Sequence, residues 1–274
     1  MNPPRSLHEI QPVLRALAQT SAVIIGGQAV NLWAEHYQKD SSPWKELRPY
    51  TSFDLDVLGN RTDVLKCSQS LNATPFFPGP DESTANSGKI ITQVGNSDFE
   101  IDFLHSPKGL APAEITELAR AITFETITLR VLHPIHCVES KTVNLATLPQ
   151  NTGERQDLKH LRLSIAILRE YLTELTVQRS HDNLLLRWAH RIRTDANHEL
   201  GLQATIRHGI NFQDAIPADL WREYPGALAD FVNGEWQKWA DEIAEKTSDL
   251  RDLDTWVKSL KDKSAALDSE HLGG

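Results

Sequence analysis

The hydrophobic periodicity changes once along this chain of 274 residues, and that change constrains the fold more than any other feature. Up to residue 132, short apolar runs of strand length are bounded by Gly, Pro, Asn and Ser and alternate with helical patterns. From Pro134 onwards no strand pattern remains, and amphipathic stretches continue to about residue 266. We therefore predict an α/β (α+β) fold. A small mixed β-sheet flanked by helices would occupy residues 1–135, and an all-helical domain residues 136–274.

The patterns of the first half predict alternating elements. Strands are expected at 22–25, 53–58, 89–95, 99–105 and 126–132. Helices are expected at 8–19, 28–37, 61–71 and 112–121, and loops rich in Pro, Gly, Asn and Ser at 39–52 and 72–88. His133, next to Pro134, is expected to end the last strand. The tail at 269–274 is expected to fray.

Composition excludes several classes of protein. The chain has 28 Lys plus Arg against 37 Asp plus Glu, a net charge of −9, which argues against a globally basic nucleic-acid clamp. Two cysteines, Cys67 and Cys137, cannot form a disulfide framework or a four-cysteine zinc site. The N-terminus lacks a signal-peptide core, and no apolar run approaches the length needed to span a bilayer. We expect a soluble, cytoplasmic protein with reduced thiols and no membrane partner.

Three carboxylates carry the main chemical hypothesis. Asp54 and Asp56 stand at i and i+2 of one predicted strand and therefore share a face, and Asp102 lies on a later strand. Mg²⁺ prefers such oxygen ligands and keeps substrate phosphates in its coordination shell. The alternative is an ordinary solvated strand face, which is the commoner fate of an isolated Asp-x-Asp.

A Gly-Gly pair precedes these carboxylates. The apolar run 22–25 ends at Gly26 and Gly27, and a helical pattern follows directly. Free backbone N–H groups at such a helix start suit a phosphate, although a lone Gly-Gly is more often a plain turn. The ordered series of strand, Gly-Gly, helix, Asp-x-Asp strand and third Asp is the more specific signal.

Three segments in this series resemble a known superfamily. The segments GGQAVNLW at 26–33, SFDLDV at 52–57 and FEIDFL at 99–104 are similar to the signature motifs of polymerase-β-like nucleotidyltransferases. The resemblance covers residues 20–165 and is closest to the branch that contains AbiEii-type toxins, where a long loop separates the first two motifs. That loop ends in an Arg and a Ser or Thr, for which Arg48, displaced along the chain, and Ser52 are the candidates.

The resemblance continues into two helices. VLHPIHCVESKTVNL resembles the strand and proline-started helix that carries a Lys, here Lys141. ERQDLKHL resembles the second helix with its Asp, here Asp157, but His160 replaces the usual second acid. For Lys141 an exposed helical lysine is an equally good interpretation, and for Asp157 a cap or salt bridge is the better one.

The resemblance implies a function and a site. It implies Mg²⁺-dependent transfer of a nucleoside monophosphate from an NTP to a hydroxyl, with release of pyrophosphate. Asp54, Asp56 and Asp102 would bind two Mg²⁺ ions, and Asp102 would also help to deprotonate the acceptor. The residues implied to bind the nucleotide are Gly26, Gly27, Ser52, Lys141 and Asp157. The acceptor (RNA, protein or a small molecule) and an antitoxin partner stay open, and the alternative is a non-catalytic nucleotide-binding or interaction protein.

The helical half offers one further candidate surface. Eight basic side chains share the segment 155–193 with four acids, which suits a polynucleotide acceptor as well as an ordinary solvated helix face. Arg162, Arg169, Arg187 and Arg191 are the candidate contacts. The aromatic residues Trp221, Tyr224, Phe231, Trp236 and Trp239 are expected to pack between helices. The pair His133 and His136 lacks further ligands for zinc.

Overall fold

A computed structural model describes residues 3–79, 82, 84–148, 155–179 and 182–248. It contains one seven-stranded mixed sheet and a larger set of helices, which confirms the predicted fold class. The strands are β1 (Val23–Ile24), β2 (Leu55–Leu58), β3 (Pro75–Phe76), β4 (Asn86–Val94), β5 (Ser97–Leu104), β6 (Arg120–Phe124) and β7 (Ile127–Val131). The helices of the first half are α1 (Gln11–Leu17), α2 (Gly26–Tyr37), α3 (Arg61–Leu71) and α4 (Pro112–Leu118).

Helices alone make up the described part of the second half. They are α5 (Pro134–Thr147), α6 (Asp157–Val177), α7 (Asp182–Asn197), α8 (Glu199–His208), the 3₁₀ turn η1 (Phe212–Ala215), α9 (Ala218–Glu223) and α10 (Ala227–Ser248). Within the segments that the structure describes, no helix is both long and apolar enough to cross a membrane. The predicted tail at 269–274 lies outside the described residues.

Two parallel strand pairs, β2 with β5 and β1 with β7, lie side by side in the middle of the sheet. The order is β3-β4-β5-β2-β1-β7-β6, in which β2 pairs with β5 and β1 with β7 in parallel, and the other pairs are antiparallel. Because β2 and β5 are parallel neighbours, residues 46 positions apart in the chain become cross-strand partners. This pairing brings the second and third sequence motifs together.

Local sequence explains where several elements begin. Asn60 caps α3 by accepting hydrogen bonds from the backbone N–H groups of Thr62 and Asp63, and the Asp63 side chain binds the Asn60 N–H in return. Pro112 and Pro134 stand in the first turns of α4 and α5, where proline is tolerated. The β4–β5 hairpin turns at Gly95, whose φ of +63° suits glycine.

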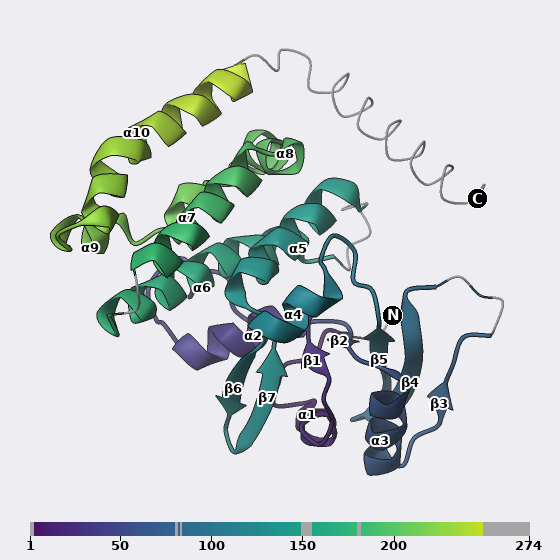
Figure 1. Ribbon diagram of the computed structural model, residues 1–274. Helices are drawn as coiled ribbons and strands as arrows, with labels where there is room; N and C mark the ends of the chain where they lie inside the picture. The colour runs from purple at the N-terminus through teal and green to yellow at the C-terminus, as the bar shows by residue number, and fades with distance from the viewer. Residues whose placement is uncertain (1–2, 80–81, 83, 149–154, 180–181, 249–274) are drawn as a thin grey trace.

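The helices cover the sheet unequally. Helix α3 packs on β4 and β3, whereas α2 packs on β2 and β6 and touches α5 and α6 with its other side. In Figure 1 the helices α5 to α10 lie above the sheet, with α5 and α6 nearest to it and α10 outermost. Buried side chains from both halves form one hydrophobic core, to which Ile24, Phe103, Leu161 and Trp221 belong. The boundary near residue 135 stays a prediction.

The structure corrects several sequence predictions. Strand β3 lies in the segment 72–88, which was expected to be a loop, and β6 begins at Arg120, within the segment expected to be a helix; pairing with β4 and β7 decides both. Strand β2 begins at Leu55, one residue after Asp54. His133 does not end a strand but caps α5 by accepting the Ile135 N–H.

The expected packing and thiols are confirmed where the structure describes them. Trp221, Phe231 and Trp239 are buried between helices, and Cys67 and Cys137 are free and buried.

Candidate functional site

One face of the sheet carries the three predicted carboxylates. Asp56 on β2 is the direct cross-strand partner of Asp102 on β5, so the two side chains share a face. Asp54 precedes β2 by one residue and lies with Asp56 in the same cavity. The pairing of β2 with β5 therefore brings the second and third motifs together.

The two glycines allow the carboxylate strand to approach α2 closely. Gly26 has a φ of +66°, and a β-carbon on it would lie 2.4 Å from Oδ2 of Asp56. A β-carbon on Gly27 would lie 2.5 Å from Oγ of Ser52, whose hydroxyl also bonds Asp54 at 3.3 Å. Helix α2 starts at Gly26 with no side-chain cap, so the N–H groups of its first turn have no capping side chain. No separate turn intervenes between strand and helix.

The helical half contributes a buried ion pair. Nζ of Lys141 on α5 lies 3.3 Å from Oδ1 of Asp157 on α6, and both side chains are less than a tenth exposed. Asn144 and Arg155 also donate to the Asp157 carboxylate, at 3.4 and 2.8 Å. Burial opposes ionisation of Asp157, but the charges of Lys141 and Arg155 outweigh it and hold the pKa of that carboxyl below its ordinary value. Asp157 therefore fixes the position of Lys141.

A cavity of about 340 Å³ is lined by Asp54, Asp56 and the Lys141–Asp157 pair, but not by Asp102 or Gly26. It lies where α5 and α6 meet the sheet, and most of the predicted site residues line it. The lining comprises Gly27, Ser52, Phe53, Asp54, Asp56, Lys141, Asn144, Arg155, Gln156, Asp157 and His160. Sequence analysis did not predict that Asn144, Arg155 and Gln156 line this cavity, because only the packing of α5 against α6 places them there. Residues 153 and 154, which precede Arg155, lie outside the described part of the chain.

Like charges crowd the carboxylate face. Burial, followed by the charge of Asp54, raises the pKa of Asp56 to about 7. Burial, followed by the adjacent Glu100 carboxylate, raises the pKa of Asp102 to about 6. Lys141 acts in the opposite direction on Asp56. The site therefore carries more negative charge than its own side chains neutralise.

Two further charged residues, one expected from the alternation at 99–105 and one not, extend this face. Glu100 stands two positions before Asp102 on β5, and Lys89 on β4 is the cross-strand partner of Asp102. Nζ of Lys89 pairs with Glu100 and lies 3.6 Å from Oδ1 of Asp102. The alternation of the predicted hairpin would have placed Glu100 on this face, but the register that selects Lys89 requires the paired strands.

The donor set suits a divalent cation in kind. Asp54, Asp56 and Asp102 offer hard carboxylate oxygens, and Oδ1 of Asp102 is buried without a hydrogen-bond partner. As the side chains lie, however, the described segments contain no group of three or more His, Cys, Asp or Glu residues arranged to hold a metal ion. Asp102 is instead drawn toward Lys89.

The other predicted residues lie apart from this cavity. Arg48 pairs with Asp40 at 2.9 Å on the surface of the 39–52 loop and does not line the site. On the helical half, Arg191 is already bound by Glu114 and Glu139, so it is poorly placed to bind a phosphate. Arg187 is exposed and lies near the Trp188 ring.

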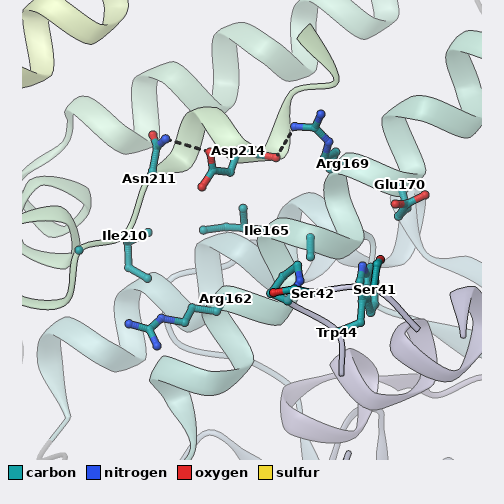
Figure 2. Close-up of a pocket in the computed structure, with 13 residues that line it drawn as sticks. Ser41, Ser42, Trp44, Arg162, Ile165, Arg169, Glu170, Ile210, Asn211 and Asp214 are labelled. Atoms are coloured by element: carbon teal, nitrogen blue, oxygen red, sulfur yellow. Dashed lines mark hydrogen bonds between the residues drawn. The ribbon is translucent and has the colours of Figure 1, made fainter. Parts of the chain in front are cut away.

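Arg162 and Arg169 line a second, larger cavity of about 460 Å³, which Figure 2 shows. This cavity lies between the 41–44 segment, α6 and the segment 209–214. None of the predicted catalytic, metal or nucleotide residues lines it.

Comparisons with known proteins yield only distant likeness. No known protein-family profile matches this chain, and no curated protein matches it in sequence. A solved structure of an antigenic nucleotidyltransferase-like protein from Paracoccidioides brasiliensis is 13% identical, covers 68% of this chain and 95% of its own, and has a TM-score of 0.41. JHP933 from Helicobacter pylori is 14% identical over 96% of this chain and 95% of its own, with a TM-score of 0.33. The structural neighbours thus include a nucleotidyltransferase-like protein, and likeness of this size says nothing about activity or about the AbiEii-type branch.

Proposed function

We propose that this protein is a Mg²⁺-dependent nucleotidyltransferase that transfers a nucleoside monophosphate from an NTP to a hydroxyl. One observation carries the proposal: Asp56 and Asp102 are cross-strand partners on one sheet face, with Asp54 beside Asp56, at the uncapped start of α2. Such an arrangement joins an acidic face to free backbone donors. The pattern favours phosphate chemistry over a solvated strand face, because Asp56 and Asp102 are partly buried and neighbouring carboxylates raise the pKa of each.

The nucleotide phosphates would occupy the cavity beside Gly26 and Gly27. The backbone N–H groups at the start of α2 and the Ser52 hydroxyl are the neutral donors there. Lys141 would contact a phosphate as a point charge, held in place by Asp157. Arg155, which is 31% exposed and already bound to Asp157, would add a second cation at the mouth of the same cavity.

Asp54, Asp56 and Asp102 would hold Mg²⁺, which supplies neutralisation of phosphate charge when it is bound. In the transfer, the acceptor oxygen forms a bond to the α-phosphorus and the bond from that phosphorus to the β-phosphate oxygen breaks. Pyrophosphate leaves, and the acceptor proton passes to the carboxylate of Asp102.

The alternative is a protein that binds nucleotides or partners without transfer. The Lys89–Asp102 ion pair favours it, because an ammonium group at the third carboxylate competes with a cation there. An antitoxin partner, membership in the toxin branch, a cytoplasmic location and the identity of the NTP and of the acceptor all belong to the same set of proposals. RNA, a protein side chain and a small molecule are the three acceptor classes.

The test is incubation with each α-³²P-labelled NTP, Mg²⁺ and total RNA, total protein or a panel of hydroxylated small molecules. We expect one labelled product class, lost with EDTA and in Asp102→Asn. The matched control is Asp98→Asn, which removes an exposed carboxylate from the same strand outside the cavity and should leave labelling unchanged. Nucleotide binding without any labelled product would support the non-catalytic alternative.

A further inference from the structure

The larger cavity has the size of a small-molecule site and is separate from the carboxylate face. Its volume of about 460 Å³ lies within the range of pockets that take small organic ligands. Ile165 and Ala166 of α6 form its apolar base, and Trp44 and Ile210 contribute to its walls. Figure 2 shows Ile165 at the centre, with Asn211 and Asp214 on one side and Ser42 and Trp44 on the other.

Two arginines at this cavity lack carboxylate partners. Arg162 donates to the backbone carbonyl of His208 at 3.3 Å, and Arg169 to those of Asp214 and Ile216 at 3.4 and 3.2 Å. Within the described segments, neither guanidinium lies within ion-pair distance of a carboxylate. Each keeps N–H groups beyond those already used, because a guanidinium has five.

Other arginines of the helical half are neutralised. Arg193 is bound by Glu235 at 3.0 Å and by Glu242, and Arg191 is bound by two glutamates. Ion pairs therefore neutralise Arg191 and Arg193, but neither arginine of this cavity.

Positive charge is highest at the Arg162 end. The His208 ring lies close to Arg162 and Arg207, and burial followed by these two charges lowers the pKa of His208. An anion bound there would relieve the repulsion between cations. Arg169 lies seven residues further along α6, a separation of about 10.5 Å at 1.5 Å per residue.

The Arg169 end is mixed in character. Asn211 Nδ2 donates to Oδ1 of Asp214 at 2.9 Å, which fixes the carboxylate against the cavity. The Asp214 carboxylate accepts hydrogen bonds, and Arg169 and Asn211 supply donors beside it. Such a pairing of acceptor and donors suits the polar edge of a heterocycle, whose flat faces fit between Ile165 and the opposite wall.

We propose that this cavity binds a nucleoside monophosphate unit. The phosphate would lie at Arg162, beside His208, and the base would lie over Ile165 with its edge toward Asp214 and Asn211. The unit can come from a free nucleotide or from the end of an RNA strand. The proposal does not depend on catalysis at Asp54, Asp56 and Asp102.

Isothermal titration calorimetry on the full chain in EDTA tests this site, because EDTA removes any divalent cation from the carboxylate face. The probes are the four nucleoside monophosphates, the matching nucleosides, inorganic phosphate and short single-stranded RNA with a terminal phosphate. We expect at least one nucleotide to bind with 1:1 stoichiometry and more tightly than its nucleoside and than inorganic phosphate. Tighter binding of RNA than of the free nucleotide identifies a strand end as the source, and the reverse identifies a free nucleotide.

Four variants locate the binding. Arg162→Gln should weaken binding about tenfold or more, as expected for loss of a charge-assisted hydrogen bond. Ala166→Leu keeps every charge, fills the base of the cavity and should also abolish binding. Arg187→Gln removes an exposed arginine outside the cavity and should leave binding unchanged, as should Asp56→Asn. Circular dichroism establishes that each variant is folded.

Three results would overturn the proposal. The first is absence of binding by every nucleotide and by RNA. The second is binding that survives both Arg162→Gln and Ala166→Leu, or that Asp56→Asn abolishes, because the ligand then occupies another site. The third is equal affinity for inorganic phosphate and nucleotides, because the cavity would then recognise the phosphate alone and not the nucleoside.

Discussion

Replacement of Gly26 by alanine tests how closely the carboxylate strand approaches α2. Alanine at a φ of +66° costs about 1–2 kcal/mol, since the left-handed region is unfavourable for a residue with a β-carbon. Gly95→Ala isolates this contribution, because Gly95 has a φ of +63° and a β-carbon there would meet nothing within 4 Å. We expect Gly95→Ala to lower the melting temperature by about 2–4 °C per kcal/mol lost.

Gly26→Ala adds a steric contribution that Gly95→Ala lacks. The new β-carbon would lie 2.4 Å from Oδ2 of Asp56, and the Cγ and Cβ atoms of Asp56 are also close, at 3.2 and 3.1 Å. The whole carboxylate must therefore rotate or the backbone must shift. Overpacking of this kind costs about 1–3 kcal/mol, so the total for Gly26→Ala is about 2–5 kcal/mol.

A double-mutant cycle with Asp56→Ala separates the two contributions. Removing the carboxylate removes most of the clash, so Gly26→Ala in that background should cost only the backbone contribution. Urea unfolding monitored by circular dichroism gives the four free energies of unfolding. The reasoning is refuted if Gly26→Ala and Gly95→Ala agree within about 0.5 kcal/mol, or if the two substitutions of the cycle are additive within that margin.

Four further outcomes are expected. Asp54→Asn and Asp56→Asn should keep the fold, with a melting temperature in EDTA that holds or rises as like-charge repulsion falls, while nucleotide transfer is lost; transfer at the wild-type rate would contradict the site. Mg²⁺ with NTP should raise the melting temperature more than either alone, and equal shifts from Mg²⁺ and from the pair would count against a shared site. Asp157→Asn should lower the free energy of unfolding in urea by about 3 kcal/mol, because Lys141 stays buried without its carboxylate. Arg155→Gln removes a more exposed partner of Asp157 and should lower it by less than about 1 kcal/mol. Burial lowers the pKa of His133 from 6.5 to about 2, so below pH 6.5 the unfolded chain binds a proton that the folded chain excludes. This group alone should lower the free energy of unfolding by about 2 kcal/mol between pH 7 and pH 5. His133→Asn should abolish that loss while keeping a cap for α5.

Several parts of the fold could be predicted from local sequence because their signals are local. Helix α3 runs over 61–71 as expected, since Asn60 and Asp63 form a capping box within four residues. The hairpin β4–β5 follows from two alternating runs around Gly95. The alternation of Phe, Leu and Val with Asp around 53–57 likewise predicted that Asp54 and Asp56 share a face.

Strand partners were beyond prediction. Strand β3 lies in a segment rich in Pro, Gly, Asn and Ser that indicated a loop, and β6 begins with the last two residues of a predicted helix; pairing with β4 and β7 decides both. The same holds for Lys89, which reaches Asp102 only through the register of two paired strands. A register joins residues by position across strands, and no short segment encodes it.

The sequence by itself singled out the candidate residues of this protein: the Gly-Gly pair and the three aspartates by their order and spacing, and Lys141 and Asp157 by resemblance. Only the tertiary structure decided which groups surround them. It buried Lys141 against Asp157, drew Asp102 toward Lys89, and left Arg162 and Arg169 without carboxylates at a second cavity while neutralising Arg191. The physical reason is that the pKa, partner and accessibility of a charged side chain depend on groups brought beside it by long-range packing, and those groups lie tens of residues away in the chain.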